Sequence, residues 1–360
     1  MPTGTPKSLS DLEVLTTGVV FPDLADAGGA GGIPHDRLAP FIPPLIDLSR
    51  RYVTGANPAV STMTQAHAYA LYYLPINVAK VRRLLREIRS PRGSIRLLDF
   101  GCGPGTASLA AAMSLEVPLE IDAIEHSAPM STLATQLLGA MQAVRPELSF
   151  SLREEPGDRY DLIIAANVLN ELPPAEVPAL LARFVGALAP RGALILLEPA
   201  LQPTTRALMG IRDLVVERYR DLTVRFPCTR ADRCPMRQSG SNDWCHDYLA
   251  WEAPPLVRTL DELTGFNKHR IKYSGLVFEC DAVLQSGLRV VTIPESDKVG
   301  TRATLCGPEV YGEVELMKRH RSETNRAYGR VELYDLITIE PPPISGKIQP
   351  GALVRRTRSP

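Results

Sequence analysis

The sequence predicts an α/β protein whose central domain is built on a doubly wound, largely parallel sheet. Between residues 95 and 200, short apolar runs alternate with segments of helical periodicity, which is the pattern of repeated β-α units. The first apolar run leads into a glycine-rich turn and then a helix. The pattern differs on both sides of this domain, which predicts an N-terminal helical cap and a small C-terminal β-rich lobe.

Size and composition are those of a folded protein. A chain of 360 residues can form a full α/β core and a smaller lobe, and 44% hydrophobic with 22% charged residues argues against disorder. Forty basic residues balance forty acidic ones, so binding to nucleic acid would need a local patch. Without a signal peptide or an apolar run of roughly 18 residues, we expect a cytoplasmic protein with no membrane partner.

The N-terminal part divides into a leader and a helical region. Residues 1–35 contain a stretch rich in glycine and alanine at 25–32, which offers little apolar surface, so we predict a flexible leader. For residues 36–94 we predict a helical cap, because apolar side chains recur three and four residues apart at Leu71, Leu74, Val78, Val81, Leu84, Leu85 and Ile88.

The central domain should span residues 95–200. We expect strands at 95–100, 119–124, 162–166 and 193–198, and helices at 106–115, 129–141 and 174–188.

Three further segments follow the central domain. Residues 201–270 form a basic, cysteine-containing segment with a helix at 256–263, and residues 341–360 read as a flexible basic tail. Between them, residues 271–340 should form an antiparallel lobe. Its expected strands are 272–277, 287–293, 303–305, 313–317 and 330–339.

The glycine-rich turn points to S-adenosylmethionine (SAM). Three features favour SAM over a dinucleotide: an acidic residue before the first glycine, a third glycine only two residues after the second, and an acidic residue ending the next strand. Cys102 occupies a position that needs a small residue, which suggests packing. The candidate loop residues are Asp99, Gly101, Cys102, Gly103 and Gly105.

The acidic residue that ends the next strand is Glu125, twenty positions after Gly105. A carboxylate there can accept both ribose hydroxyls of an adenosine, and His126 would flank the nucleoside. Asp99 would support the loop or bind the methionine amine. The alternative is that Asp99 and Glu125 only cap strand ends in solvent.

A buried strand near residues 160–166 opens into a polar loop, where open α/β sheets bind ligands. Asn167, Asn170 and Glu171 are the catalytic candidates facing the methyl group, and Asn167 is also a candidate for cofactor binding. No obvious base is present, but methyl transfer can proceed largely by positioning. Alternatively, Asn170 and Glu171 cap the next helix. Over residues 95–199 these pieces resemble the first, second and fourth motifs of class I SAM-dependent methyltransferases.

Three cysteines lie within eighteen residues: Cys228, Cys234 and Cys245. The five and ten residues between them are atypical of zinc sites, whereas iron-sulfur clusters tolerate more varied spacing. The fourth ligand could be Cys306, Cys280 or His246. The alternative is a set of free thiols.

The order of these motifs resembles the Rsm-type family of mitochondrial small-ribosomal-subunit assembly proteins, which includes methyltransferase-like protein seventeen and bacterial relatives. The resemblance rests on the SAM domain, Pro-Cys-x5-Cys-Pro at 227–235, Trp-Cys-His at 244–246 and Leu-Cys at 305–306. It implies a 4Fe-4S cluster, with zinc as the alternative, and a role with ribosomal RNA or the small subunit. The implied cluster ligands are Cys228, Cys234, Cys245 and Cys306.

Two basic groups are candidate contacts for RNA phosphates, although a solvated face is the commoner explanation of a charge run. They comprise Arg218, Arg220, Arg225, Arg230, Arg233 and Arg237 in one, and Lys318, Arg319, His320 and Arg321 in the other. The sequence therefore predicts a SAM-dependent methyltransferase acting on RNA or the small ribosomal subunit. The alternatives are a non-catalytic iron-sulfur assembly factor and a methyltransferase for a small-molecule or peptide acceptor.

Overall fold

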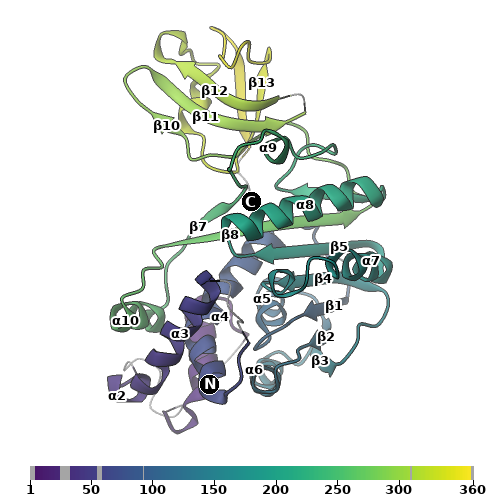
Figure 1. The fold of residues 1–360 in the computed structure, drawn as a ribbon, viewed down its shortest axis with the longest axis vertical. Coiled ribbons are helices and arrows are strands. Elements are labelled where there is room, and N and C mark those ends of the chain that lie inside the picture. Colours follow the sequence, from purple (N-terminus) through teal and green to yellow (C-terminus); the bar gives the residue numbers. More distant parts are fainter. Residues whose placement is uncertain (1–4, 25–32, 55–58, 92, 309, 358–360) are drawn as a thin grey trace. The chain divides into compact units, whose positions relative to one another are not determined.

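A computed structural model describes residues 5–24, 33–54, 59–91, 93–308 and 310–357 (Figure 1). The chain forms two compact units. The first comprises Met1–Glu198 and Leu249–Tyr273, and the second comprises Pro199–Tyr248 and Ser274–Pro360. The segment that we expected to run from 201 to 270 is therefore shared, and its end belongs to the first unit with α10 (Pro255–Thr264).

The sheet of the first unit confirms the predicted α/β class. Its strands lie in the order β3-β2-β1-β4-β5 and every neighbouring pair is parallel. Their bounds are β1 Ile95–Phe100, β2 Leu119–Ile124, β3 Leu148–Arg153, β4 Tyr160–Ala166 and β5 Leu188–Glu198. We did not predict β3, because only Leu148 is fully buried on it and polar residues interrupt any apolar run.

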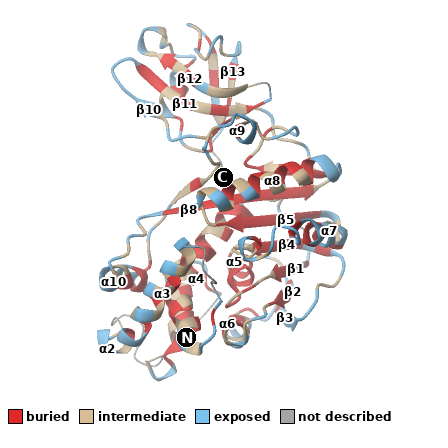
Figure 2. Cartoon of the chain, in the orientation of Figure 1, coloured by how far each residue is buried: buried red, intermediate tan, exposed pale blue. Residues whose placement is uncertain are grey.

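Helices connect these strands, and the strand interiors are buried (Figure 2). They are α5 (Thr106–Ser114) after β1, α6 (Ala128–Val144) after β2 and α7 (Val177–Ala187) after β4. The short helix η3 (Leu169–Glu171) lies between β4 and α7. Burial on both faces explains the continuous apolar runs of β1, β4 and β5. Because the strands are parallel, their carboxyl ends share one edge of the sheet.

The helical cap contains α1 (Leu9–Val20), α2 (His35–Leu38), α3 (Ile42–Thr54) and α4 (Met63–Leu85), with short helices η1 (Pro22–Leu24) and η2 (Ala39–Phe41). Helix α4 packs against α5 and α6. Apolar residues of the cap and of α10, including Leu45, Leu71 and Val257, form one buried cluster.

The structure corrects the prediction of a flexible leader at 1–35. Helix α1 begins with a capping box between Ser8 and Asp11, and Leu12 and Leu15 are fully buried. The helix forms because this face packs against α4 and α6. The glycine-rich stretch 25–32 lies outside the described residues.

The second unit begins with α8 (Gln202–Arg218), β6 (Leu222–Phe226) and α9 (Pro235–Gln238). Strands β7 (Asp247–Ala250) and β8 (Arg270–Cys280) each have residues in both units, and β8 pairs with β6 in antiparallel orientation. None of the helices in the described ranges is long and apolar enough to span a membrane.

An antiparallel sheet of six strands forms the predicted β-rich lobe, in the order β10-β11-β9-β13-β14 with β12 beside β11. The strands are β9 Leu288–Val290, β10 Glu295–Ser296, β11 Gly300–Gly307, β12 Val310–Met317, β13 Leu336–Glu340 and β14 Leu353–Thr357, with short helices η4 Lys318–His320 and η5 Arg326–Arg330. The lobe has an apolar cluster of its own.

The structure also corrects the predicted flexible tail at 341–360. Strand β14 pairs with β13 from Leu353 to Thr357, and Val354 is buried in the lobe. Arg356 forms ion pairs with Asp335 and Glu332. The basic residues of this segment therefore belong in part to a strand.

Helix α1 should contribute measurably to stability. We expect Leu15→Ala to lower the free energy of unfolding by about 2–5 kcal/mol, because it removes a fully buried side chain. Urea denaturation followed by circular dichroism measures the change. Ser10→Ala, at an exposed position of the same helix, is the control, and equal midpoints for the two variants would show that α1 does not stabilise the fold.

Candidate functional site

The glycine loop after β1 has the backbone that its sequence predicts. Gly101, Gly103 and Gly105 have φ angles of 67°, 55° and 86°, a region that favours glycine. A Cβ on Gly101 would lie 2.6 Å from Cγ2 of Val168, whereas a Cβ on Gly103 would meet no atom within 4 Å. Gly101 therefore allows close packing against the loop after β4, and Gly103 faces open space that a ligand can enter.

Asp99 anchors the helix that follows the glycine loop. Its side chain is buried, and Oδ2 accepts hydrogen bonds from the Ser108 backbone N (2.8 Å) and Oγ (2.7 Å). Burial raises the pKa of Asp99 to about 6. Asp99 is thus no solvent-exposed cap. Cys102 is also buried, and its backbone N donates to the Ile124 oxygen at 2.9 Å.

Glu125 connects the glycine loop to the end of β2. Its Oε2 accepts a hydrogen bond from the Gly103 backbone N at 2.8 Å, and its Oε1 accepts one from the Ser127 N at 2.7 Å. Each carboxylate oxygen has a second lone pair, so a hydroxyl donor can still be accommodated. His126, the next residue, is exposed.

The chain turns sharply at Asn167 after β4. Its φ of 59° is uncommon for a residue other than glycine, although asparagine tolerates it, and its backbone N donates to the Leu197 oxygen at 2.7 Å. This turn places Asn170 and Glu171 in η3. Neither residue caps α7, since that helix begins at Val177 without a side-chain cap.

Glu171 lies among groups that alter its acidity. Glu171 is an exposed residue, yet the surrounding protein, together with the negative charge of Glu125, raises the pKa of its carboxyl to about 7. Two tyrosines of the helical cap, Tyr52 and Tyr69, interact electrostatically with Glu171. Both contact the ring of Tyr73, with centroids 5.4 Å apart.

Sequence reasoning missed Glu198 and these tyrosines. Glu198 is 2% exposed, its Oε1 accepts a hydrogen bond from the Leu169 N at 2.9 Å, and its Oε2 has no partner among the described residues. Burial raises its pKa to about 8. The position was available as a signal, because Glu198 ends a predicted strand at the ligand-binding edge. Nothing in the helical pattern identified the tyrosines.

In the second unit, four cysteines from separate segments line one pocket. They are Cys228 after β6, Cys234 before α9, Cys245 before β7 and Cys306 in β11. The other proposed fourth ligands do not line it. Cys280 pairs with Leu222 in the β6-β8 ladder, and His246 stacks on Trp244.

The pocket differs from a site for one metal ion. Burial raises the pKa of Cys234, Cys245 and Cys306, and no disulfide joins any of the cysteines. Within the described ranges, no three His, Cys, Asp or Glu side chains are grouped closely enough to ligate a single ion.

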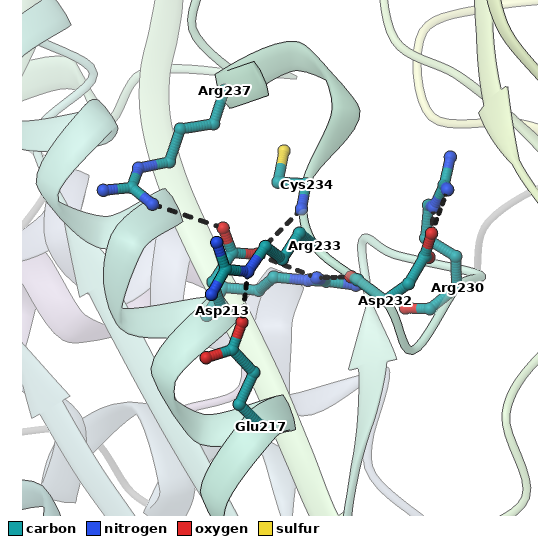
Figure 3. Close-up of polar contacts among 8 residues, drawn as sticks. Asp213, Glu217, Arg230, Asp232, Arg233, Cys234 and Arg237 are labelled. Atoms are coloured by element: carbon teal, nitrogen blue, oxygen red, sulfur yellow. Dashed lines mark hydrogen bonds and ion pairs between the residues drawn. The ribbon is translucent and has the colours of Figure 1, made fainter.

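Carboxylates of the second unit neutralise much of the first basic group (Figure 3). Arg225 pairs with Glu279 (3.1 Å), and Arg230 pairs with Asp232. The other two pairs are Arg233 with Glu217 (2.6 Å) and Arg237 with Asp213 (3.4 Å). Arg218 and Arg220 are exposed, as are Lys318, Arg319 and Arg321 of the second group. The exposed positive charge is therefore smaller than the sequence suggests.

The chain resembles known proteins at several levels. A family model described as mitochondrial small ribosomal subunit Rsm22 matches residues 63–328. A carboxy-S-adenosyl-L-methionine synthase from Psychrobacter arcticus is 34% identical over 239 residues, which covers 64% of this chain and 82% of the relative.

Two solved structures show more distant likeness. The plantazolicin methyltransferase BpumL in complex with SAH is 10% identical and has a TM-score of 0.36. That match covers 76% of this chain and 96% of the BpumL chain. Phosphoethanolamine N-methyltransferase 1 of Haemonchus contortus is 13% identical and has a TM-score of 0.37. That match covers 68% of this chain and 50% of the other protein. Likeness at this level carries no argument about substrate.

A substitution at Gly103 tests whether the glycine loop binds the cofactor. Gly103→Ala should retain the fold, because its Cβ meets no protein atom, but the Cβ would occupy ligand space and the positive φ adds strain of about 1–3 kcal/mol. We expect the affinity for S-adenosylhomocysteine, measured by calorimetry, to fall at least about tenfold. Gly139→Ala, in α6 and equally free of contacts, is the control. Unchanged affinity in Gly103→Ala would refute the loop assignment.

Proposed function

Because the chain belongs to the Rsm22 family, we propose that it transfers methyl groups from SAM to RNA or to another component of the small ribosomal subunit. It is a member of the class I SAM-dependent methyltransferase superfamily, with the parallel sheet and the glycine loop of that fold. The observation that carries the proposal is the place of Glu171 in the loop after β4, where its carboxyl interacts electrostatically with Glu125 and the tyrosines of the cap.

In this proposal, the residues of the first unit have separate roles. Gly101, Gly103 and Gly105 shape the loop that holds SAM, and Glu125 binds the ribose beside His126. Asp99 holds the loop against α5. Bound SAM supplies an electrophilic methyl group. Asn167 and Asn170 orient the acceptor.

Glu171 accepts the proton that the acceptor releases on methylation. A base with a pKa near the working pH suits this role, because it is ionised often enough to act and basic enough to take the proton. Asn167 sets the direction of the chain that presents Glu171, and Glu198 holds the same loop through Leu169. A strained residue and a buried carboxyl at one loop are features of functional sites.

Two observations favour an RNA acceptor. Tyr52 and Tyr69 are half-buried aromatic residues of the cap that interact electrostatically with Glu171, and aromatic side chains are the groups on which unstacked RNA bases stack. Lys318, Arg319 and Arg321 are exposed cations that can contact phosphates. The family description also names the small ribosomal subunit.

We propose further that Cys228, Cys234, Cys245 and Cys306 bind a 4Fe-4S cluster. They line one pocket, and its other lining residues include the apolar Leu208, Met209, Met236 and Val291. A cluster binds each thiolate at a different iron, so its ligands stand farther apart than those of a single ion. The cluster would join the loop after β6 to β11.

A second candidate is a non-catalytic assembly factor, favoured by a family description that names a ribosomal subunit and no reaction. Turnover of SAM separates the two, since an assembly factor binds SAM without consuming it. A methyltransferase with a small-molecule or peptide acceptor would instead turn SAM over without associating with small-subunit particles.

Replacement of Glu171 tests the catalytic proposal. With tritiated SAM and small-subunit particles from cells lacking the protein, Glu171→Gln should reduce methyl transfer about 10²–10⁴-fold and leave SAM affinity within about twofold. Glu176→Gln, an exposed acid nearby, is the control. The wild-type rate should fall as the pH drops below about 7, because the carboxylate becomes protonated. A rate independent of Glu171 would exclude it as the base.

Anaerobic purification tests the cluster. We expect about four irons and four sulfides per wild-type chain and broad visible absorption. Cys234→Ser should lose most of both, whereas Cys280→Ser should retain them, because Cys280 does not line the pocket. Zinc without iron, by elemental analysis, would contradict the cluster.

A further inference from the structure

Arg212 is a buried cation inside the cysteine pocket that the proposed function does not use. It lies on α8 and is 1% exposed. Its guanidinium donates hydrogen bonds to the backbone oxygens of Arg230 and Asp232. Both acceptors lie in the loop between Cys228 and Cys234, so one side chain holds that loop from inside the unit.

The next residue of α8 holds the end of the same loop. Asp213 is buried, and its Oδ1 accepts a hydrogen bond from the Cys234 backbone N at 2.8 Å (Figure 3). The same oxygen accepts a hydrogen bond from Arg212 at 2.9 Å. Its Oδ2 pairs with Arg237 at 3.4 Å. Because these contacts use backbone atoms of the loop, they position the cysteines without requiring a bound metal.

Arg212 also faces the sulfur atoms. It lines the same pocket as Cys228, Cys234, Cys245 and Cys306, and its Nε has no hydrogen-bond partner among the described residues. Arg289 is the other buried arginine of the pocket. It already donates to the oxygens of Pro227 (2.8 Å) and Tyr334 (2.8 Å) and to Gln285 Oε1 (2.6 Å).

Cysteines that bind a cluster do so as thiolates, and thiolates in a pocket of this kind would need a compensating charge. Transfer of an unpaired negative charge into a buried site is costly, and a buried cation beside it offsets that cost. Arg212 is placed to do this, whereas the guanidinium of Arg289 is directed to three oxygens. Positive charge and hydrogen bonds near the sulfurs also raise the reduction potential of an iron-sulfur cluster.

We propose that Arg212 is the positioning residue of the four-cysteine site, holding the Cys228–Cys234 loop ready for metal and compensating the charge of the thiolates. The charge-compensating part rests on the proposed cofactor. The positioning part does not, because the contacts with Arg230, Asp232 and Asp213 are present in the chain alone.

The experiment uses the full-length protein, purified without oxygen, with Arg212→Gln, Arg212→Lys and the control Arg218→Gln at an exposed position of the same helix. Iron release to a chelator should be at least about tenfold faster in Arg212→Gln, the size of effect typical of residues that support metal ligands. Its reduction potential should be more negative. Arg212→Lys should have a reduction potential close to that of the wild type, because lysine keeps the positive charge. It should release iron faster, because lysine lacks the planar guanidinium that donates to two loop oxygens. Arg218→Gln should match the wild type in both.

A second measurement needs no metal. In chelator-treated protein, Cys228 and Cys234 should react faster with a thiol reagent in Arg212→Lys than in the wild type, because lysine keeps the positive charge but loses the guanidinium contacts with the loop. Cys280 should react at an unchanged rate. Circular dichroism checks that the variant is folded. Equal iron release and equal thiol reactivity would overturn the proposal.

The two proposals fail separately. If the wild-type protein contains neither iron nor zinc, the proposed cofactor and the charge-compensating role are both rejected. The thiol reactivity then tests the positioning role by itself. If the wild type holds a cluster, and iron release, reduction potential and thiol reactivity are all unchanged in the Arg212 variants, the cofactor proposal stands and the inference is overturned.

Discussion

The hydrogen bonds of the buried Asp99 carboxylate to the backbone and side chain of Ser108 determine the geometry of the first unit's site. They fix the start of α5 to the end of β1, so the intervening loop must turn within a few residues. Glycine permits that turn, and Glu125 secures it from the neighbouring strand through Gly103. The parallel sheet then brings the loop after β4 to the same edge.

Two polar residues at this edge of the sheet, Glu198 and Asn167, have features that lower stability. Glu198 leaves one carboxylate oxygen without a partner among the described residues, and Asn167 adopts an uncommon backbone conformation. Both features cost free energy of folding. A fold selected for stability alone would replace them, so their presence where parallel strands end supports a ligand-binding role.

The second unit organises its cysteines by the same physical means. Backbone oxygens and one backbone N of the cysteine loop are satisfied by two adjacent side chains of a helix, Arg212 and Asp213. Such side chain to backbone contacts fix a loop that has no regular hydrogen bonds of its own. In each unit, therefore, a buried charged side chain shapes a loop that carries the residues of interest.

Local patterns in the sequence predicted the strands β1, β2 and β4, the glycine loop with Glu125, and the loop containing Asn167 and Glu171, because each depends on residues close together in the chain. They did not predict α1, β3, β14 or the proximity of Tyr52 and Tyr69 to Glu171. Those features depend on packing between distant segments, which periodicity does not encode. Likewise, spacing left Cys306, Cys280 and His246 as equal candidates beside Cys228, and only the pairing of strands placed Cys306 on the pocket wall.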